Sequence, residues 1–403
     1  MKKTLIIIAS ALAMVGCANS INVEEIVDTA ERSIGFSAFT HKAITKGSID
    51  SLESIEASKT EYVMKSYQMT TVFPDASSIA KTYFEANFGY GINADYAEAW
   101  NTQNTYFWPK ETVTENGIVA TNSLSFFTYG PASEDISFDS NGYSGAVERT
   151  YPCLTVTVAD ENSNQKDILA AMTEFRTYSA DVISAEANKV NIDYNHILSA
   201  VTFAANTKDS VVFKVREIKV GVQLNAEDST VSSRLYPSGR YGFAADNAKG
   251  VWSNLSGDLK SYGVGLAVAG ADNFVKVDST NQSANVKINA DDQVLMLIPQ
   301  PIEEEGAYFS VKYDVFDKED NPLDTAVVKY APLFATKLPE WLTGKKYNYI
   351  FTLRRDINHP IEYTVQVEGW EEQDVIEQFE GQYISDRDLP VYEDGGDEFD
   401  KEW

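Results

Sequence analysis

The chain has very little cysteine, histidine and positive charge. Its 403 residues include two cysteines and three histidines, and 33 lysines and arginines stand against 60 aspartates and glutamates, a formal net charge of -27. A chain with this much negative charge repels nucleic acid and anionic lipid headgroups. We therefore expect no nucleic-acid partner. His41, His196 and His359 lie far apart and lack the spacing of metal ligands. We expect neither a metal nor a cofactor.

Sequence signatures of catalysis are also missing. There is no Gly-x-Ser-x-Gly elbow, no P-loop and no Gly-x-Gly-x-x-Gly fingerprint. A pair of catalytic carboxylates stays possible, but among 60 acidic residues chance pairs carry no information. Asp317, Asp320 and Asn321 in "FDKEDNPLD" could bind calcium, although a hairpin turn is the better interpretation. We predict that the protein is not an enzyme, and a secreted hydrolase is the least favoured hypothesis.

Long apolar runs are absent except at the start, "MKKTLIIIASALAMVGCANS". Two lysines precede the apolar run 5–15, which is shorter than the roughly 20 residues needed to span a bilayer. Gly16-Cys17 closes it and resembles the lipobox of bacterial lipoproteins. The resemblance implies that 1–16 is removed, that Cys17 carries acyl chains such as palmitate, and that 17–33 is a tether at the outer membrane. An ordinary signal peptide with a chance cysteine is the alternative.

Removal of the signal peptide leaves an acidic chain with one unmodified cysteine. Without Lys2 and Lys3 the charge changes from -27 to -29, so attachment to a membrane must come from the lipid. With Cys17 acylated, Cys153 has no partner for an internal disulfide. Cys153 lies in "YPCLTVTV", where we expect a small buried side chain, with a reactive thiol as the alternative.

What the chain does have is strand patterning. It contains 22 tyrosines and 20 phenylalanines, which favour β-strands. Apolar residues alternate in 34–40, 61–73, 153–160, 308–317, 345–353 and 361–370. In 211–224 the alternation changes phase at Arg216-Glu217, which predicts a bulge. Residues 164–175 have helical spacing, but this stretch is short. Short strands separated by turns predict an all-β fold of antiparallel sandwiches.

The mature chain, about 385 residues, is long enough for two domains. We place their boundary in the polar stretch "SADVISAEANK", which gives β-sandwiches over 34–185 and 186–370. The remaining tail, 371–403, contains 13 acidic and 2 basic residues. It also carries the apolar residues Val375, Ile376, Phe379, Tyr383 and Ile384. This tail either folds back on its own domain or lies against a neighbouring molecule.

Several segments in order resemble the fimbrillin family of Bacteroidetes, the type V pilins. They are "YFWP" (106–109), "LSFFTYGP" (124–131), "QKDILAA" (165–171), "NHILSAVTF" (195–203) and the closing "GKKYNYIFTL…YTVQVEGW". The resemblance implies two tandem transthyretin-like β-sandwiches, lipoprotein export, no catalysis and other fimbrial subunits as partners. The expected function is a fimbrial subunit or cell-surface adhesin with a possible host or glycan receptor.

The resemblance also implies assembly by β-strand addition. In the family's stalk subunits an arginine-specific protease cuts after the first strand, and a neighbour's strand fills the vacated place. Here the first strand would be 34–40, and the loop after it has Lys42, Lys46 and Lys59 but no arginine. We therefore expect either a lysine-cleaving protease or a role as tip, anchor or minor subunit. The segment 371–385 is a candidate donor strand, and folding back on its own domain is an equal alternative.

Two further hypotheses remain open. Thr29, Ser210 and Thr325 lie in Asp-Ser/Thr-apolar triplets that resemble O-glycosylation sites of Bacteroidetes. The alternative function is a surface glycan-binding lipoprotein of a polysaccharide-uptake system. Aromatic residues in "YPSGRYGF" and in 83–108 could then form a sugar-stacking surface, although burial in sheet cores is their simpler role.

Overall fold

The structure is a computed structural model. It describes residues 33–40, 52–73, 77–110, 112–115, 118–143, 150–178, 188–224, 231–244, 250–268, 272–281, 285–303, 306–369 and 377–380. Nine residues of the sequence-based hypotheses lie outside this part: Cys17, Thr29, His41, Lys42, Lys46, Val375, Ile376, Tyr383 and Ile384. The side chain of Phe379 is not described either.

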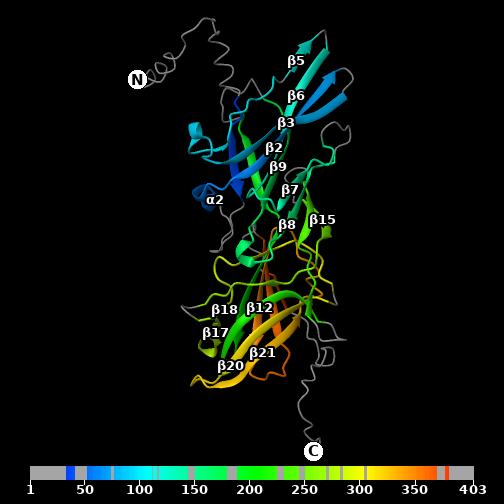
Figure 1. Ribbon diagram of the computed structural model, residues 1–403. Coiled ribbons are helices and arrows are strands. Elements are labelled where there is room, and N and C mark those ends of the chain that lie inside the picture. Colours follow the sequence, from blue (N-terminus) through cyan, green and yellow to red (C-terminus); the bar gives the residue numbers. More distant parts are fainter. Residues whose placement is uncertain are drawn as a thin grey trace, which may run out of the picture.

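The described residues form four β-sheets, whose arrangement Figure 1 shows. The first has the order β1 (Phe36–Thr40), β10 (Val190–His196), β9 (Leu169–Arg176), β6 (Ile118–Gly130), β2 (Tyr62–Phe73), β3 (Ser77–Tyr90) and β4 (Trp100–Thr102), with β5 (Thr112–Glu115) beside β6. The second has the order β15 (Val251–Ser256), β14 (Ser238–Gly242), β8 (Cys153–Thr157) and β7 (Ile136–Asp139).

The other two sheets come from the second half of the chain. One has the order β18 (Val286–Lys287), β11 (Ser199–Thr207), β22 (Lys345–Leu353), β23 (Glu362–Gly369) and β24 (Glu377–Glu380), with β19 (Leu295–Leu297) beside β11. The other has the order β13 (Val231–Ser233), β12 (Val212–Leu224), β20 (Tyr308–Phe316) and β21 (Pro322–Pro332), with β16 (Tyr262–Gly263) and β17 (Val275–Asp278) beside β12.

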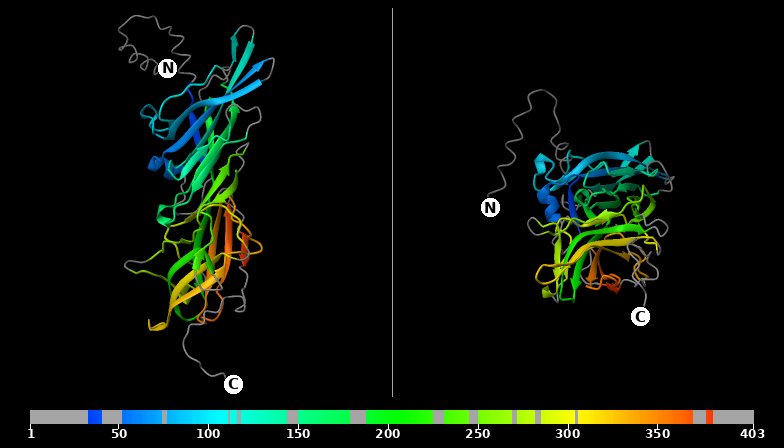
Figure 2. Two further views of the ribbon diagram at one scale, coloured as in Figure 1. Left: turned by 45° about the vertical axis from the view of Figure 1, so that its right-hand side comes forward. Right: turned by 60° about the horizontal axis from the view of Figure 1, so that its bottom comes forward.

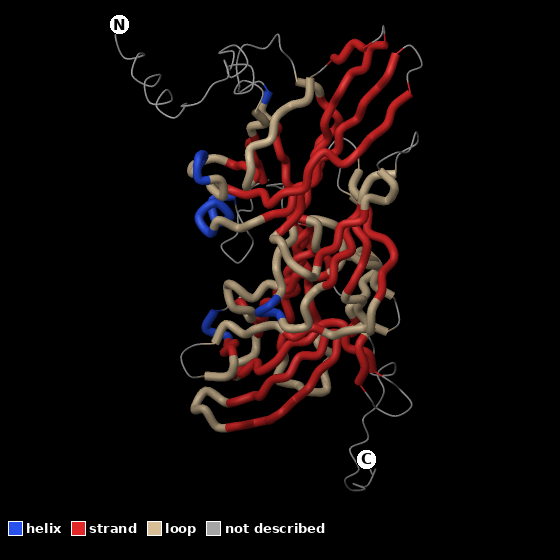
Figure 3. The backbone as a smooth tube through the Cα atoms, turned by 45° about the horizontal axis from the view of Figure 1, so that its top comes forward, coloured by secondary structure: helices blue, strands red, loops and turns tan. Residues whose placement is uncertain are grey.

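Helices are few in the described part of the chain, as the blue segments of Figure 3 show. They are α2 (Leu52–Ser58) and the short 3-10 turns η1 (Ala94–Tyr96), η2 (Asn162–Asn164) and η4 (Ser279–Asn281). None of them has both the length and the apolar character needed to cross a membrane. The predicted all-β class is therefore confirmed.

Local strand predictions hold well. The bulge expected at Arg216-Glu217 is present, because the register of β12 against β20 shifts between Val215 and Glu217. The sheets are mainly antiparallel as predicted, but β1 pairs with β10 and β11 pairs with β22 in parallel. The helical spacing of 164–175 was misleading, since Leu169–Arg176 is strand β9, paired between β6 and β10. Strand pairing on both sides satisfies its backbone, which outweighs a weak local preference.

The two halves of the chain share the second sheet. Strand β14 pairs antiparallel with β8, and β15 pairs with β14. Residues 238–256 therefore complete a sheet whose other two strands come from residues 136–157, and Figure 1 shows β7, β8 and β15 close together midway along the molecule. The boundary at 185/186 stays a prediction. A division there would place the hairpin of β14 and β15 in the second half of the chain, although its sheet partners belong to the first half.

Candidate functional site

The N-terminal strand β1 is the site to which the sequence hypotheses point. Residue by residue it runs parallel to β10, from Phe36 beside Val190 to Thr40 beside Tyr194. Just before β1, Ser33 bridges Phe107, and the amide of Ile34 donates to the carbonyl of Tyr106 at 2.8 Å. Figure 2 shows this strand in dark blue in the upper part of the molecule.

Alternate side chains of this segment point into the core. Ile34, Phe36 and Ala38 are 4–6% exposed, whereas Phe39 is 52% exposed. The Phe36 ring lies 5.2 Å from Phe88 and 5.6 Å from Phe126, both in edge-to-face geometry. Because successive side chains of a strand point to opposite faces, β1 has one apolar face, and this face closes the core like a plug. We call the surface that receives it the β1 seat: strand β10, residues 106–107, and the rings of Phe88 and Phe126.

Polar contacts fix the edges of the β1 seat. Ser37 Oγ donates to Asn191 Oδ1 at 2.6 Å, and the amide of Val190 donates to the Gly35 carbonyl at 2.9 Å. The start of β10 is held by Arg176, whose Nη1 donates to the Lys189 carbonyl at 2.9 Å. Burial lowers the pKa of the Arg176 guanidinium, which lies 5.7 Å from the Trp108 ring. These contacts therefore hold the β1 seat in place. Without β1, the backbone groups of β10 that face it would lack hydrogen-bond partners.

Of the candidate cleavage sites only Lys59 is described. It follows helix α2, is exposed, and has φ 51°. Helix α2 is itself part of the core, because Ile55 is fully buried and Glu56 Oε1 accepts from Trp100 Nε1 at 2.8 Å. A cut after Lys59 would therefore free α2 together with β1.

The candidate donor segment is described only over Glu377–Glu380. It forms β24, antiparallel to β23 of the same chain, with Phe379 opposite Val365 and Glu380 opposite Thr364. This is the fold-back alternative for these four residues. The donor hypothesis for the longer segment stays a prediction.

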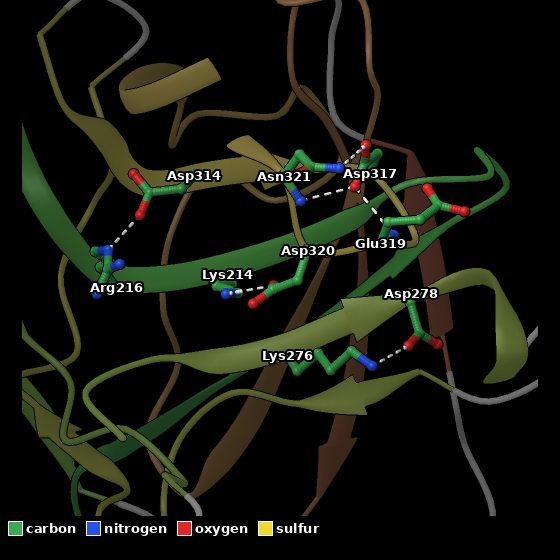
Figure 4. A network of polar contacts seen from close by, with 9 residues as sticks. All are labelled: Lys214, Arg216, Lys276, Asp278, Asp314, Asp317, Glu319, Asp320 and Asn321. Carbon is green, nitrogen blue, oxygen red and sulfur yellow. Dashed lines mark hydrogen bonds and ion pairs between the residues drawn. The ribbon is translucent and has the colours of Figure 1, made fainter. Parts of the chain in front are cut away.

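Figure 4 shows the polar network around the proposed calcium ligands. Asp317 Oδ1 accepts from the amides of Glu319 at 3.0 Å and Asn321 at 2.7 Å, and Asp320 pairs with Lys214 at 2.7 Å. These contacts hold the turn between β20 and β21, so the hairpin interpretation is confirmed. Among the described residues no group of three or more His, Cys, Asp or Glu is arranged to hold a metal.

Two other titratable candidates are buried against polar partners. His196 is buried against Asp167, with 2.6 Å between Nδ1 and Oδ2. Cys153 is 3% exposed, and its Sγ accepts from Arg240 Nε at 2.7 Å. The two candidate glycosylation residues within the described part, Ser210 and Thr325, are exposed.

An open groove of about 620 Å³ lies along β15, against residues 299–301 and 340–343. Its lining includes three exposed apolar side chains, Tyr236, Val251 and Leu342. Six of the aromatic residues proposed for sugar stacking are instead buried: Phe84, Phe88, Trp100, Trp108, Tyr241 and Phe243. Within "YPSGRYGF", Tyr236 is the aromatic residue that lies at the surface, with 39% of its area exposed.

Comparisons with known proteins agree with the fold. Residues 57–370 match the model of a family described as fimbrillin-like. The crystal structure of a fimbrial protein from Bacteroides vulgatus is similar, with a TM-score of 0.56 and 14% identity over 84% of this chain and 99% of that chain. The tip fimbrial protein Mfa3 from Porphyromonas gingivalis is more distant, with a TM-score of 0.32 and 8% identity over 77% of this chain and 94% of that chain. A search of curated proteins finds no match.

Proposed function

This chain belongs to the fimbrillin-like family, and we propose that it is a fimbrial subunit or cell-surface adhesin that joins its neighbours by β-strand addition at the β1 seat. The observation that carries the proposal is the separable character of β1. It is five residues long, it lies at the end of its sheet, and it seals an apolar cluster with one face. A strand of this kind can be replaced by another without disturbing the rest of the fold.

Removing β1 would create the two features that strand addition requires. The backbone of β10 would lose its hydrogen-bond partners along one edge, and Phe88 and Phe126 would lose the cover of Phe36. Unpaired edges and exposed apolar surface both favour the capture of another strand. Cleavage after Lys42 or Lys46 would release β1 alone and leave α2 in the core, so these two positions suit the mechanism better than Lys59.

The chain acts at the cell surface, and we propose that acylated Cys17 holds it at the outer membrane. Cleavage after β1 would separate the lipid on Cys17 from the folded part of the chain that forms the β1 seat. An uncut chain would stay attached as an anchor or capping subunit. Stalk, tip and anchor roles thus differ by one proteolytic step.

An unboiled SDS gel of surface material, with N-terminal sequencing of each band, tests strand addition. We expect heat-labile, SDS-resistant bands of high mass whose copies of this chain begin after Lys42, Lys46 or Lys59. Combined Lys42→Gln and Lys46→Gln substitution should shift cleavage or abolish the bands, whereas Lys81→Gln at an exposed site of β3 should not. If the chain runs only as a monomer in all samples, assembly at this seat is wrong.

The groove beside β15 supports a second candidate function, glycan binding. Its exposed Tyr236 offers a ring face, and the Glu340 carboxylate at the rim offers hydrogen-bond acceptors. Glycan-array binding that Tyr236→Ala abolishes and Tyr83→Ala preserves would support it. The absence of any saturable glycan binding would exclude it.

A further inference from the structure

The β1 seat accepts only certain side chains, and this limits which strand can fill it. We infer that the seat takes a strand from a different subunit, not the C-terminal tail of a second copy of this chain. The inference rests on the proposed function, since it concerns the partner that replaces β1. It follows from the match between the seat and three alternate side chains.

The seat requires an apolar, then an aromatic, then a small residue. Ile34, Phe36 and Ala38 occupy it, and they belong to one buried hydrophobic cluster with residues such as Ile55, Phe88 and Phe126. A charged side chain at one of these positions would be buried among apolar groups without an opposite charge, which is strongly unfavourable. The central position is the most specific, because Phe36 fits edge-to-face against two rings.

The acidic tail offers no such triplet. In residues 371–403, every set of three alternate positions includes a charged, amide or hydroxyl side chain, or a glycine. With Phe379 at the position of Phe36, Glu377 would replace Ile34 and Gly381 would replace Ala38. With Tyr383 there instead, Gly381 would leave the place of Ile34 empty.

The described part of the tail is already paired within its own chain. Residues Glu377–Glu380 pair with Thr364–Val367 of β23 in the same chain. Donation to a second copy would first break this pairing and would then bury Glu377. Both steps oppose a homopolymer formed through the tail. An open seat would instead bind a strand that carries the Ile-x-Phe-x-Ala pattern or a close equivalent.

Peptide exchange on the full mature chain tests this inference. A site for a sequence-specific protease is inserted between Thr40 and Leu52, and the chain is cut without separating β1. Circular dichroism identical to that of the uncut chain shows that the fold is kept. Fluorescent peptides are then added: residues 33–40, residues 373–383, and the second peptide with Glu377→Ile and Gly381→Ala. The uncut chain is the control.

We expect the 33–40 peptide to enter the seat of the cut chain and the native tail peptide to bind at least about 100-fold more weakly. The doubly substituted tail peptide, which has Ile, Phe and Ala in the three positions, should recover most of the affinity. Native tail binding equal to that of 33–40 would overturn the inference and leave strand addition intact. Failure of 33–40 itself to exchange would overturn both.

Discussion

His196 and Asp167 form a buried polar pair, with 2.6 Å between Nδ1 and Oδ2 and side chains 1% and 0% exposed. His196 ends β10 and pairs with Leu169 of β9, and the next amide, that of Ile197, donates to the Ile168 carbonyl at 3.0 Å. The pair therefore ties the beginning of β9 to the point where the chain leaves for β11. It fixes the crossing between the sheet that holds the β1 seat and the rest of the molecule.

We predict that His196→Ala or Asp167→Ala lowers the free energy of unfolding by about 2–5 kcal/mol, because each leaves a buried polar group without its partner. The double variant His196→Ala with Asp167→Ala should lose less than the sum of the single losses, since neither partner is left orphaned. Urea unfolding monitored by tryptophan fluorescence measures all four proteins. Strictly additive losses would contradict the coupling.

Lys346 gives a prediction of pH dependence. Burial lowers its pKa from the ordinary 10.5 to about 8, against the opposing attraction of Glu368 and Asp167. Below pH 8 the folded state must hold a charged, partly desolvated ammonium, and this cost disappears as Lys346 loses its proton in the folded state between pH 8 and 10.5. Lys346→Met should therefore be more stable than the natural chain by about 1–2 kcal/mol at pH 7, after allowing for solvent screening.

The difference for Lys346→Met should close by pH 10.5. Urea unfolding at pH 7, 9 and 10.5 measures it. Lys81→Met, at an exposed site on β3, should give no gap that varies with pH. A constant difference between Lys346→Met and the natural chain across this range would contradict the assignment.

Period-two patterns made most of the strands predictable. Alternation in 34–40 identified β1 and its inward side chains, because strand geometry sends successive residues to opposite faces. The phase change at Arg216-Glu217 identified the bulge in β12 for the same reason. These features depend on neighbours in the sequence alone.

Partner choice between distant strands was not predictable. Nothing in the alternation of 34–40 reveals that β1 would run parallel to β10. The paired residues Phe36 and Val190 are more than 150 positions apart in the sequence. In β9, Ala170 and Ala171 have a high intrinsic preference for helix. Their small side chains nevertheless fit a strand buried between β6 and β10. The hairpin of β14 and β15 likewise joins β8 through contacts that only the folded chain brings together.

The plug character of β1 predicts a contrast between two phenylalanines. Phe36→Ala should lower the free energy of unfolding by about 3–5 kcal/mol, because it leaves a cavity beside Phe88 and Phe126. Phe39→Ala, three residues along the same strand but 52% exposed, should change it by less than about 0.5 kcal/mol. Thermal unfolding of the uncut mature chain distinguishes them. Equal effects would mean that β1 is not seated through its inner face.

Exposure of Ser210 and Thr325 supports both as candidate O-glycosylation sites. If Thr325 is modified, the intact mass of protein from its native host exceeds the sequence mass, and Thr325→Ala removes one glycan increment. Thr202→Ala is the matched control, since this threonine is half-buried in β11 and donates to Asn348 Oδ1. An intact mass equal to the sequence mass plus lipid would exclude modification at both positions.

The two cysteines allow the lipid anchor to be tested against an internal control. Cys153 is buried in β8 and receives a hydrogen bond from Arg240, so it is inaccessible to an acyl-transfer enzyme. We predict that labelled palmitate is incorporated into the natural chain and into Cys153→Ala, and that Cys17→Ser abolishes it. Because one or more buried acyl chains supply about 0.8 kcal/mol per methylene, Cys17→Ser should also move the protein from the membrane to the soluble fraction. Absence of labelling in the natural chain itself would mean that Cys17 is not acylated and would favour an ordinary signal peptide before the mature chain.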